Sequence, residues 1–167
     1  MLELGRPGTA GVDRGAMPVL RDGAIVGSLL ASPWWERATA RAGDREWVYT
    51  RAGRELAGRW AAEPEGAVRL SARPLSAWKG TWTADLDGTA VEIHPAAWWK
   101  TTRRYAVGGR VIGESGNAGR WVPRPTLDLD DTLGLDAQVF LLWVELVLRR
   151  RTAAGGAAAA AAGGAAS

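Results

Sequence analysis

The sequence predicts a mainly β protein in which a closed antiparallel sheet encloses one C-terminal helix. Three observations support this fold class: polar and apolar residues alternate from Pro18 to about Pro125, turn signals interrupt that region repeatedly, and residues 137–148 are almost uniformly apolar. A large antiparallel sheet exposes two edges, and a helix that is apolar on nearly every side has to be enclosed. Closing the sheet into a barrel around the helix meets both requirements.

Residues 1–16 are predicted to lie outside the folded domain. They are glycine-rich, lack periodicity and contain no apolar stretch of signal-peptide length. Structure is expected to begin at Met17, and translation could start there or at Met1. We therefore expect a disordered N-terminal segment over residues 1–16 and a barrel domain over residues 17–151.

Turn signals divide the alternating region into strands. Residues Thr81–Leu86 are typical, because the even-numbered residues are apolar and the odd-numbered residues are polar. Gly, Asn and Asp tolerate the positive φ that tight hairpin turns require. The signals lie at residues 22–23, 43–44, 52–53, 65–66, 87–88, 108–109 and 117–119. Their number indicates about eight or more antiparallel strands.

Residues 137–148, AQVFLLWVELVL, are predicted to form the enclosed helix. Gln138 and Glu145 are its polar residues, and a spacing of seven places them on one helical face. The segment is shorter than the about 20 residues that a membrane span needs. We expect Glu145 to have a structural role, in a polar seam with Gln138 that meets Arg149 or an arginine from a strand.

Residues 152–167, TAAGGAAAAAAGGAAS, are predicted to form a disordered Ala/Gly tail. The tail carries no charged side chain and no side chain larger than threonine. It therefore cannot bury enough apolar area to offset the entropy lost when a chain becomes ordered.

The order of these elements, the pairs Trp34-Trp35 and Trp98-Trp99, and the terminal VFLLWVELVLRRR over residues 139–151 resemble the tubby C-terminal-like superfamily. The resemblance covers about residues 18–151. That group includes tubby-like proteins, phospholipid scramblases and LURP-one-related proteins, and the chain looks most like its small uncharacterised actinobacterial members. The resemblance implies a closed antiparallel barrel of about twelve strands around a central hydrophobic C-terminal helix. Tubby proteins bind phosphoinositides through basic surface residues, but no sharp motif carries a binding residue over to this chain.

Residues 100–124 are the candidate binding region. They hold six basic residues against the single acid Glu114, and aromatic residues from Trp98 to Trp121 are interleaved with them. The solvated outer face of a strand pair, which involves no ligand, is the favoured interpretation of this stretch. If the stretch binds a ligand, basic and aromatic residues together indicate an anionic lipid or single-stranded nucleic acid. The candidate contacts to an anionic ligand are Lys100, Arg103, Arg104, Arg110, Arg120 and Arg124.

No catalytic residue, metal site or cofactor is predicted. Residues Asp85–Thr89 match the DxDGT motif of haloacid-dehalogenase-like phosphatases, but they lie between two alternating strands, so a hairpin turn is expected there. His94 is the single histidine and has no suitable serine partner. One histidine without cysteine makes no transition-metal site, and the acids at residues 128–131 lack EF-hand spacing.

These observations favour a non-catalytic barrel module that binds an anionic lipid or a protein partner. A cytoplasmic location, peripheral to the membrane, is expected. The alternative is a nucleic-acid or carbohydrate binder that uses basic and tryptophan side chains, and a phosphatase-like enzyme at Asp85 and Asp87 is the least favoured reading. The chain has ten tryptophans, and we expect them mainly to pack in the core.

Overall fold

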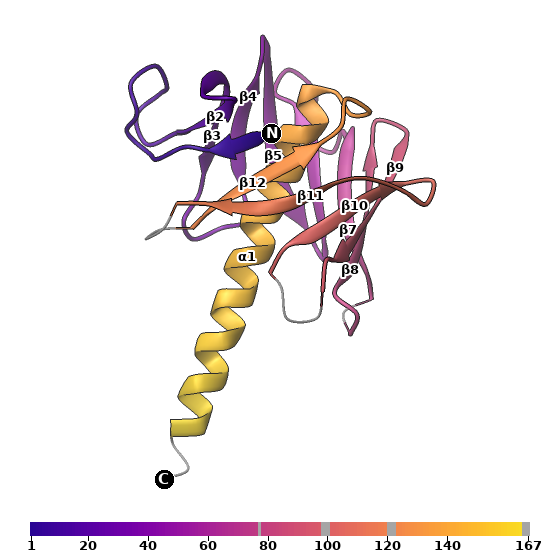
Figure 1. Cartoon of the computed structure of the whole chain (residues 1–167). Coiled ribbons are helices and arrows are strands. Elements are labelled where there is room, and N and C mark those ends of the chain that lie inside the picture. The colour runs from indigo at the N-terminus through magenta and orange to yellow at the C-terminus, as the bar shows by residue number, and fades with distance from the viewer. Residues whose placement is uncertain (77, 98–100, 120–122, 165–167) are drawn as a thin grey trace.

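The computed structural model describes residues 1–76, 78–97, 101–119 and 123–164. In these residues, twelve antiparallel strands form a closed barrel around a single helix, α1 (Figure 1). Each strand pairs with its neighbours in the sequence, and the ring closes where β1 pairs with both β12 and β2. The predicted fold class is confirmed, including the number of strands.

The elements follow one another along the chain with short connections. Their bounds are β1 Leu2–Leu4, β2 Met17–Arg21, β3 Ala24–Ala31, β4 Ala38–Ala42, β5 Arg45–Ala52, β6 Glu55–Trp60, β7 Leu70–Ser76, β8 Thr81–Leu86, β9 Thr89–Pro95, β10 Arg103–Val107, β11 Arg110–Ala118, β12 Arg124–Leu129 and α1 Leu135–Gly164.

The hairpin formed by β8 and β9 shows how alternating polar and apolar residues form the wall of the barrel. The even-numbered residues of β8 point into the barrel and are buried. Asp87 and Gly88 form the two-residue turn, with φ of 54° and 89°, the left-handed conformation that this turn requires. The Asp85 carboxylate accepts a hydrogen bond from the Gly88 N–H at 2.9 Å. The DxDGT motif is therefore a hairpin turn, as predicted.

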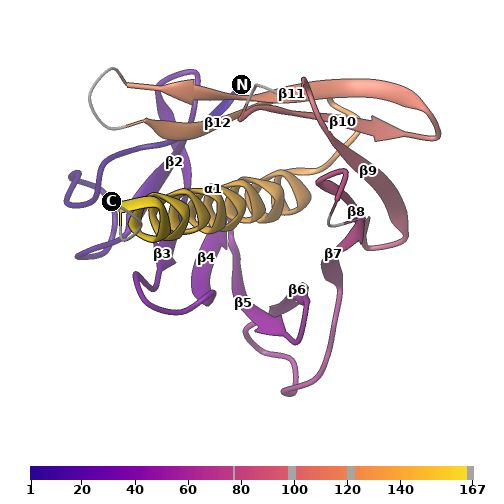
Figure 2. The ribbon, with the colours of Figure 1, turned by 90° about the horizontal axis from the view of Figure 1, so that it is seen from below.

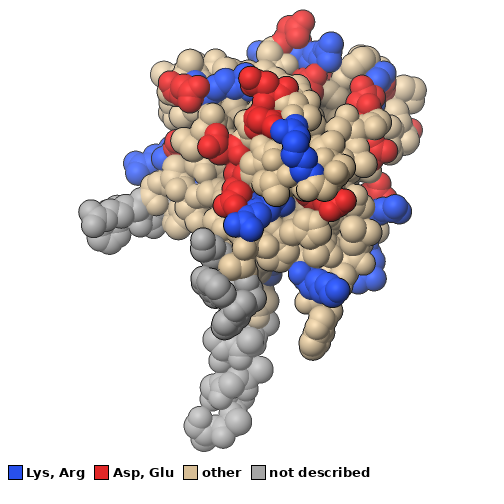
Figure 3. Space-filling model, turned by 45° about the vertical axis from the view of Figure 1, so that its right-hand side comes forward, with Lys and Arg blue, Asp and Glu red and all other residues tan. Residues whose placement is uncertain are grey.

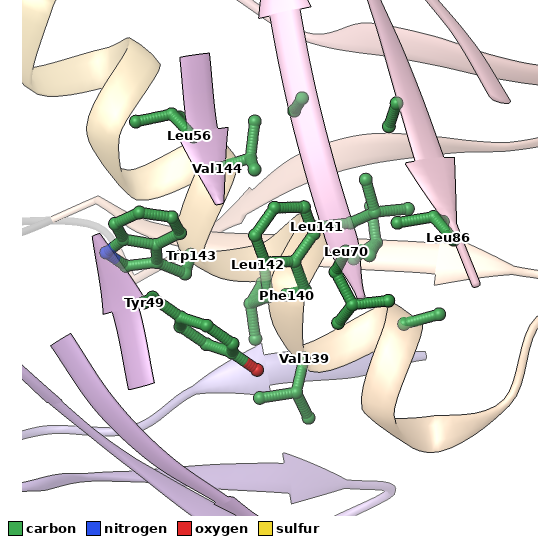
Figure 4. Close-up of a cluster of buried hydrophobic side chains, with 14 of the residues drawn as sticks. Tyr49, Leu56, Leu70, Leu86, Val139, Phe140, Leu141, Leu142, Trp143 and Val144 are labelled. Carbon is green, nitrogen blue, oxygen red and sulfur yellow. The ribbon is translucent and has the colours of Figure 1, made fainter. Parts of the chain in front are cut away.

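Helix α1 runs through the barrel, and Figure 2 shows the strands surrounding it. Residues Val139–Val144 are buried on every side. The Tyr49 ring from β5 packs against Phe140 and Trp143, with ring centroids 5.3 and 5.1 Å apart (Figure 4). The expected enclosure of the helix is confirmed, because aliphatic side chains from the other strands complete the cluster around these rings.

The expectation of a disordered segment over residues 1–16 is wrong for Leu2–Leu4. These residues form β1, and both leucine side chains are buried in the barrel core. Leu2 lies opposite Leu127 of β12 and Arg21 of β2. Without β1, the barrel would have two unpaired edges, which strand pairing removes.

Helix α1 extends to Gly164, so the expectation of a disordered tail from Thr152 is also wrong. Starting a helix is the costly step, and the enclosed residues have already formed it. Alanine has the highest helix propensity and continues the helix at little further cost. The continuation projects from one end of the barrel (Figure 1), and the side chains of residues 152–155 are exposed.

A variant that ends at Arg151 should melt within about 2 °C of the full chain, because the side chains of residues 152–155 are exposed. The measurement is thermal unfolding followed by circular dichroism on both proteins. A decrease of several degrees would show that the continuation packs against the barrel.

Candidate functional site at the helix exit

The two ends of the barrel differ in charge. The helix-start end consists of the connections after β2, β4, β6, β8, β10 and β12, and the helix-exit end consists of those after β3, β5, β7, β9 and β11 together with Arg149–Arg151. The connection after β1, residues 5–16, lies beside β3 and β4 and is counted with neither end, although it holds Arg6, Asp13 and Arg14. Among the described residues of the helix-start connections, the acids are Asp22, Asp44, Glu63, Glu65, Asp87, Asp130 and Asp131, against the single base Arg69. Among those of the helix-exit end, the bases are Arg37, Arg54, Lys79, Arg149, Arg150 and Arg151, against the single acid Glu36.

Figure 3 shows this difference on one face, where most acidic side chains lie in the upper part, with basic side chains among them, and the lowest charged side chains are basic. The opposite charges of the two ends give the barrel a polarity along the helix axis. An anion is therefore attracted to the helix-exit end and repelled from the helix-start end.

Three tryptophan side chains project into solvent at the helix-exit end. Trp34, Trp35 and Trp78 are 87%, 76% and 98% exposed. The expectation that tryptophans pack in the core holds for Trp47, Trp82 and Trp143, which are buried, and fails for these three. Contiguous exposed apolar groups often mark a binding surface, and Trp34 and Trp35 are adjacent in one connection.

A serine fixes the start of the two connections that carry Trp34, Trp35 and Trp78. Ser32 Oγ accepts hydrogen bonds from the N–H groups of Trp34 and Trp35, at 3.3 and 3.1 Å. Ser76 Oγ accepts one from the N–H of Lys79 at 3.2 Å. In these turns the serine hydroxyl accepts hydrogen bonds from backbone N–H groups that could otherwise pair with a neighbouring strand. The strands therefore end here, and the indoles lie in connections rather than in the barrel wall.

Arg149, Arg150 and Arg151 form an arginine collar that fastens the helix to the rim. Arg149 donates to the Gly116 carbonyl at 2.7 Å and to the Asn117 side chain, both on β11. Arg150 donates to the Ser32 carbonyl at 2.7 Å.

Arg151 completes the collar with a bidentate pair to the Glu36 carboxylate, at 2.6 and 2.5 Å. The hydrogen bond from Arg151 lowers the pKa of Glu36, so the pair is charged near neutral pH. The collar connects the helix to strand β11 and to the connection after β3, and it therefore positions this tryptophan-bearing connection against the helix.

Glu145, one of the two residues of the predicted polar seam, lies just inside this rim. Glu145 is fully buried and accepts hydrogen bonds from the Tyr105 hydroxyl at 2.6 Å and from Arg103 Nη1 at 2.9 Å. Arg149 Nε donates to the same carboxylate at 3.4 Å. Burial raises the pKa of Tyr105 well above its usual value, and the neighbouring Glu145 adds to the increase.

The other polar residue of the seam, Gln138, accepts a hydrogen bond from Arg21 of β2 at 3.3 Å. Both residues of the seam therefore meet an arginine from a strand, and Glu145 also meets Arg149, as expected. The pairing removes the penalty of an isolated buried carboxylate.

A groove with a volume of about 710 Å³ opens beside the collar, between the helix and the connections after β7, β9 and β11. Arg103 and Arg149 form part of its wall, and their side chains are 15% and 17% exposed. Trp78 and Lys79 line it from the connection after β7. Its apolar wall residues are Pro95, Ala97, Pro123 and Ala153.

Of the six basic residues predicted as one contact region, Arg103 and Arg104 point to opposite sides of β10. Arg103 turns inward to Glu145, whereas Arg104 is exposed and pairs with Glu114 at 2.5 Å. Reversing the charge of both would therefore disrupt the seam, and such a variant cannot isolate a surface contact.

Arg110 and Arg124 do not extend a single patch. Arg110 lies next to the helix-start end and pairs with Asp130 at 2.9 Å, and Arg124 pairs with Glu3 at 2.7 Å. Lys100 and Arg120 lie outside the described residues. The basic group at the helix-exit end comes instead from connections far apart in the sequence and from the arginine collar.

The other chemical candidates have ordinary surroundings. His94 is exposed, and its Nε2 lies 3.1 Å from a Glu92 carboxylate oxygen. Hydrogen bonds from Thr132 and then from Arg110 lower the pKa of Asp130, in the connection that leads to the helix. Within the described ranges, no group of three or more histidine, aspartate or glutamate side chains is placed to hold a metal ion.

No family model, curated protein or solved structure matches this chain. In the described part of the chain, no helix is both long and apolar enough to cross a bilayer.

Proposed function

We propose that this protein is a non-catalytic barrel module that binds the anionic surface of a membrane, on its cytoplasmic face, through the helix-exit end. The observation that carries the proposal is the exposure of Trp34, Trp35 and Trp78 on the same end of the barrel as the unmatched basic charge. Tryptophan favours the boundary between lipid headgroups and acyl chains, because its ring is apolar and its N–H can donate a hydrogen bond.

The charge polarity supports one orientation on the membrane. Each lysine or arginine near an anionic surface contributes about 1 kcal/mol, and Arg37, Arg54 and Lys79 are exposed at the helix-exit end. The acidic connections lie at the other end, so repulsion from the same surface directs them away from it. The helix axis then stands across the plane of the membrane rather than along it.

The barrel around a C-terminal helix also supports the proposed relationship to the tubby C-terminal-like superfamily. The proposal of membrane binding is independent of that relationship, because it rests on the exposed indoles and on the distribution of charge.

Replacing Trp34, Trp35 and Trp78 together by serine should weaken binding to phosphatidylcholine–phosphatidylserine vesicles at least about tenfold, since three exposed indoles lose their apolar contact with lipid. The measurement is vesicle co-sedimentation. The matched control replaces Val68 and Val111, two exposed apolar residues near the helix-start end, by serine, and its binding should be unchanged. Equal losses in the two variants would contradict the proposed orientation.

The contribution of charge is tested on the same vesicles. Arg37→Gln with Lys79→Gln should reduce binding about 30-fold, from two charges worth about 1 kcal/mol each, and added salt should weaken the wild-type protein. The control, Arg41→Gln with Arg110→Gln, removes the same charge away from the helix-exit end. Equal binding of the wild type to neutral phosphatidylcholine vesicles would show that anionic lipid is not the ligand.

A further inference from the structure

The groove at the helix exit has a charged base that the membrane-binding proposal does not use. Arg103 and Arg149 share the single buried carboxylate of Glu145, so the three groups together carry one positive charge. Among the described residues, Nη1 is the one guanidinium nitrogen of Arg103 that makes a hydrogen bond. Because Arg103 lines the groove, we take its other guanidinium nitrogens as the donors offered to a ligand there. Because both guanidinium groups are largely shielded from water, their attraction for an anion is stronger than on an open surface.

The rest of the groove is suited to an apolar group. Proline and alanine side chains form the apolar part of its walls, beside Thr101, Thr102 and Thr152. Trp78 also lines the groove and is almost completely exposed, and Lys79 adds a second positive charge there. A small inorganic anion would leave these apolar walls without a partner, whereas a purely apolar molecule would leave the arginines unneutralised. The ligand that complements both parts is an amphiphile with one anionic head and one hydrocarbon chain.

We propose that this groove binds one fatty-acid carboxylate, with its head at Arg103 and its chain along Trp78 and Ala153. The planar guanidinium fork matches the geometry of a carboxylate, and a single negative charge neutralises the positive charge of the three groups at the base. This inference goes beyond membrane binding, because a free fatty acid occupies the groove in the absence of a bilayer.

The test is isothermal titration calorimetry of the full chain with dodecanoate below its micelle concentration. We expect saturable binding of one molecule per chain. Acetate, which has the head without the chain, and dodecanol, which has the chain without the charge, should each bind at least about tenfold more weakly.

Ala153→Trp fills the groove from the helix side without changing any charge. It should weaken dodecanoate binding at least about tenfold, because the inserted ring occupies the volume of the chain. Ala154→Trp is the matched control, since Ala154 is the next residue of the exposed helix and does not line the groove, and its binding should equal that of the wild type. Arg103 is left intact, because its loss would leave Glu145 with a poorer set of partners.

Three results would overturn the proposal. These are equal binding by Ala153→Trp and the wild type, equal binding of dodecanol and dodecanoate, or uptake of several molecules per chain without saturation. Vesicle co-sedimentation of Ala153→Trp separates this inference from the proposed function, because the variant keeps the exposed tryptophans and charges, adds one indole at the same end, and should bind vesicles at least as well as the wild type. Loss of vesicle binding in the tryptophan variants therefore tests one proposal, and loss of dodecanoate binding in Ala153→Trp tests the other.

Discussion

Replacing Trp143 by alanine should lower the free energy of unfolding by about 3–5 kcal/mol, the range for truncation of a large aromatic side chain in a core. Trp143 is fully buried at the centre of the barrel, where its ring packs against Tyr49 and Phe140 at centroid separations of 5.1 and 5.8 Å. The strands are hydrogen-bonded in a closed ring, so they cannot collapse to fill the cavity. The loss should therefore lie in the upper part of that range.

The measurement is guanidinium unfolding, with the slope of the transition checked for constancy. Trp78→Ala is the control of the same residue type, because Trp78 is almost completely exposed, and its change should stay within about 0.5 kcal/mol. A change below about 0.5 kcal/mol for Trp143→Ala would mean that the helix does not fill the barrel.

The parts of the fold that the sequence predicts correctly are those that local patterns determine. A hairpin such as β8–β9 is specified by alternation on both sides of an Asp-Gly turn, and the enclosed helix is specified by its uniform apolarity. Strand β1 has neither signal. It has three residues, and its partner in β12 lies more than a hundred positions away in the chain. Only closure of the whole barrel gives Leu2 and Leu4 a buried position.

The candidate site could not be predicted as one region for a topological reason. Successive connections of an antiparallel barrel lie at alternate ends, so a contiguous basic stretch such as residues 100–124 contributes to both ends and to the wall between them. Residues from every second connection gather instead, as Arg37, Arg54 and Lys79 do. Connections that follow even-numbered strands are mostly acidic, and those that follow odd-numbered strands from β3 onward are mostly basic. The connections can be divided in this way only after every strand has been identified and numbered correctly.

The tryptophans illustrate the same limit on a smaller scale. Trp82 alternates with threonine inside a strand and is buried, whereas Trp34 and Trp35 follow Ser-Pro in a connection and are exposed. Adjacent residues of a strand point to opposite faces, so two neighbouring tryptophans cannot both point into the barrel. That argument could have assigned at least one of the pair to the outside.

Glu145→Lys should destabilise the protein by at least about 3–5 kcal/mol, the range for breaking a buried ion pair. Lysine at this position would place a third positive charge beside Arg103 and Arg149 and would leave the Tyr105 hydroxyl without its acceptor. The position is fully buried inside the closed wall, so the new charge could reach water only by distorting the rim. Loss of a cooperative unfolding transition would be the extreme form of this result.

Glu145→Gln keeps the measurement informative if the lysine variant does not fold. Glutamine retains an oxygen that accepts a hydrogen bond, and the two arginines are partly exposed, so we expect a smaller loss of about 1–3 kcal/mol. Glu114 provides the matched control, because it pairs with Arg104 at 2.5 Å on the exposed outer side of the neighbouring strand pair, where the same two substitutions should change the stability by no more than about 1 kcal/mol. If both substitutions at Glu145 changed the free energy of unfolding by the same small amount, the result would show that the Glu145 carboxylate is exposed to water. The helix would then be open on that side, and the groove would lose the charged base on which fatty-acid binding depends.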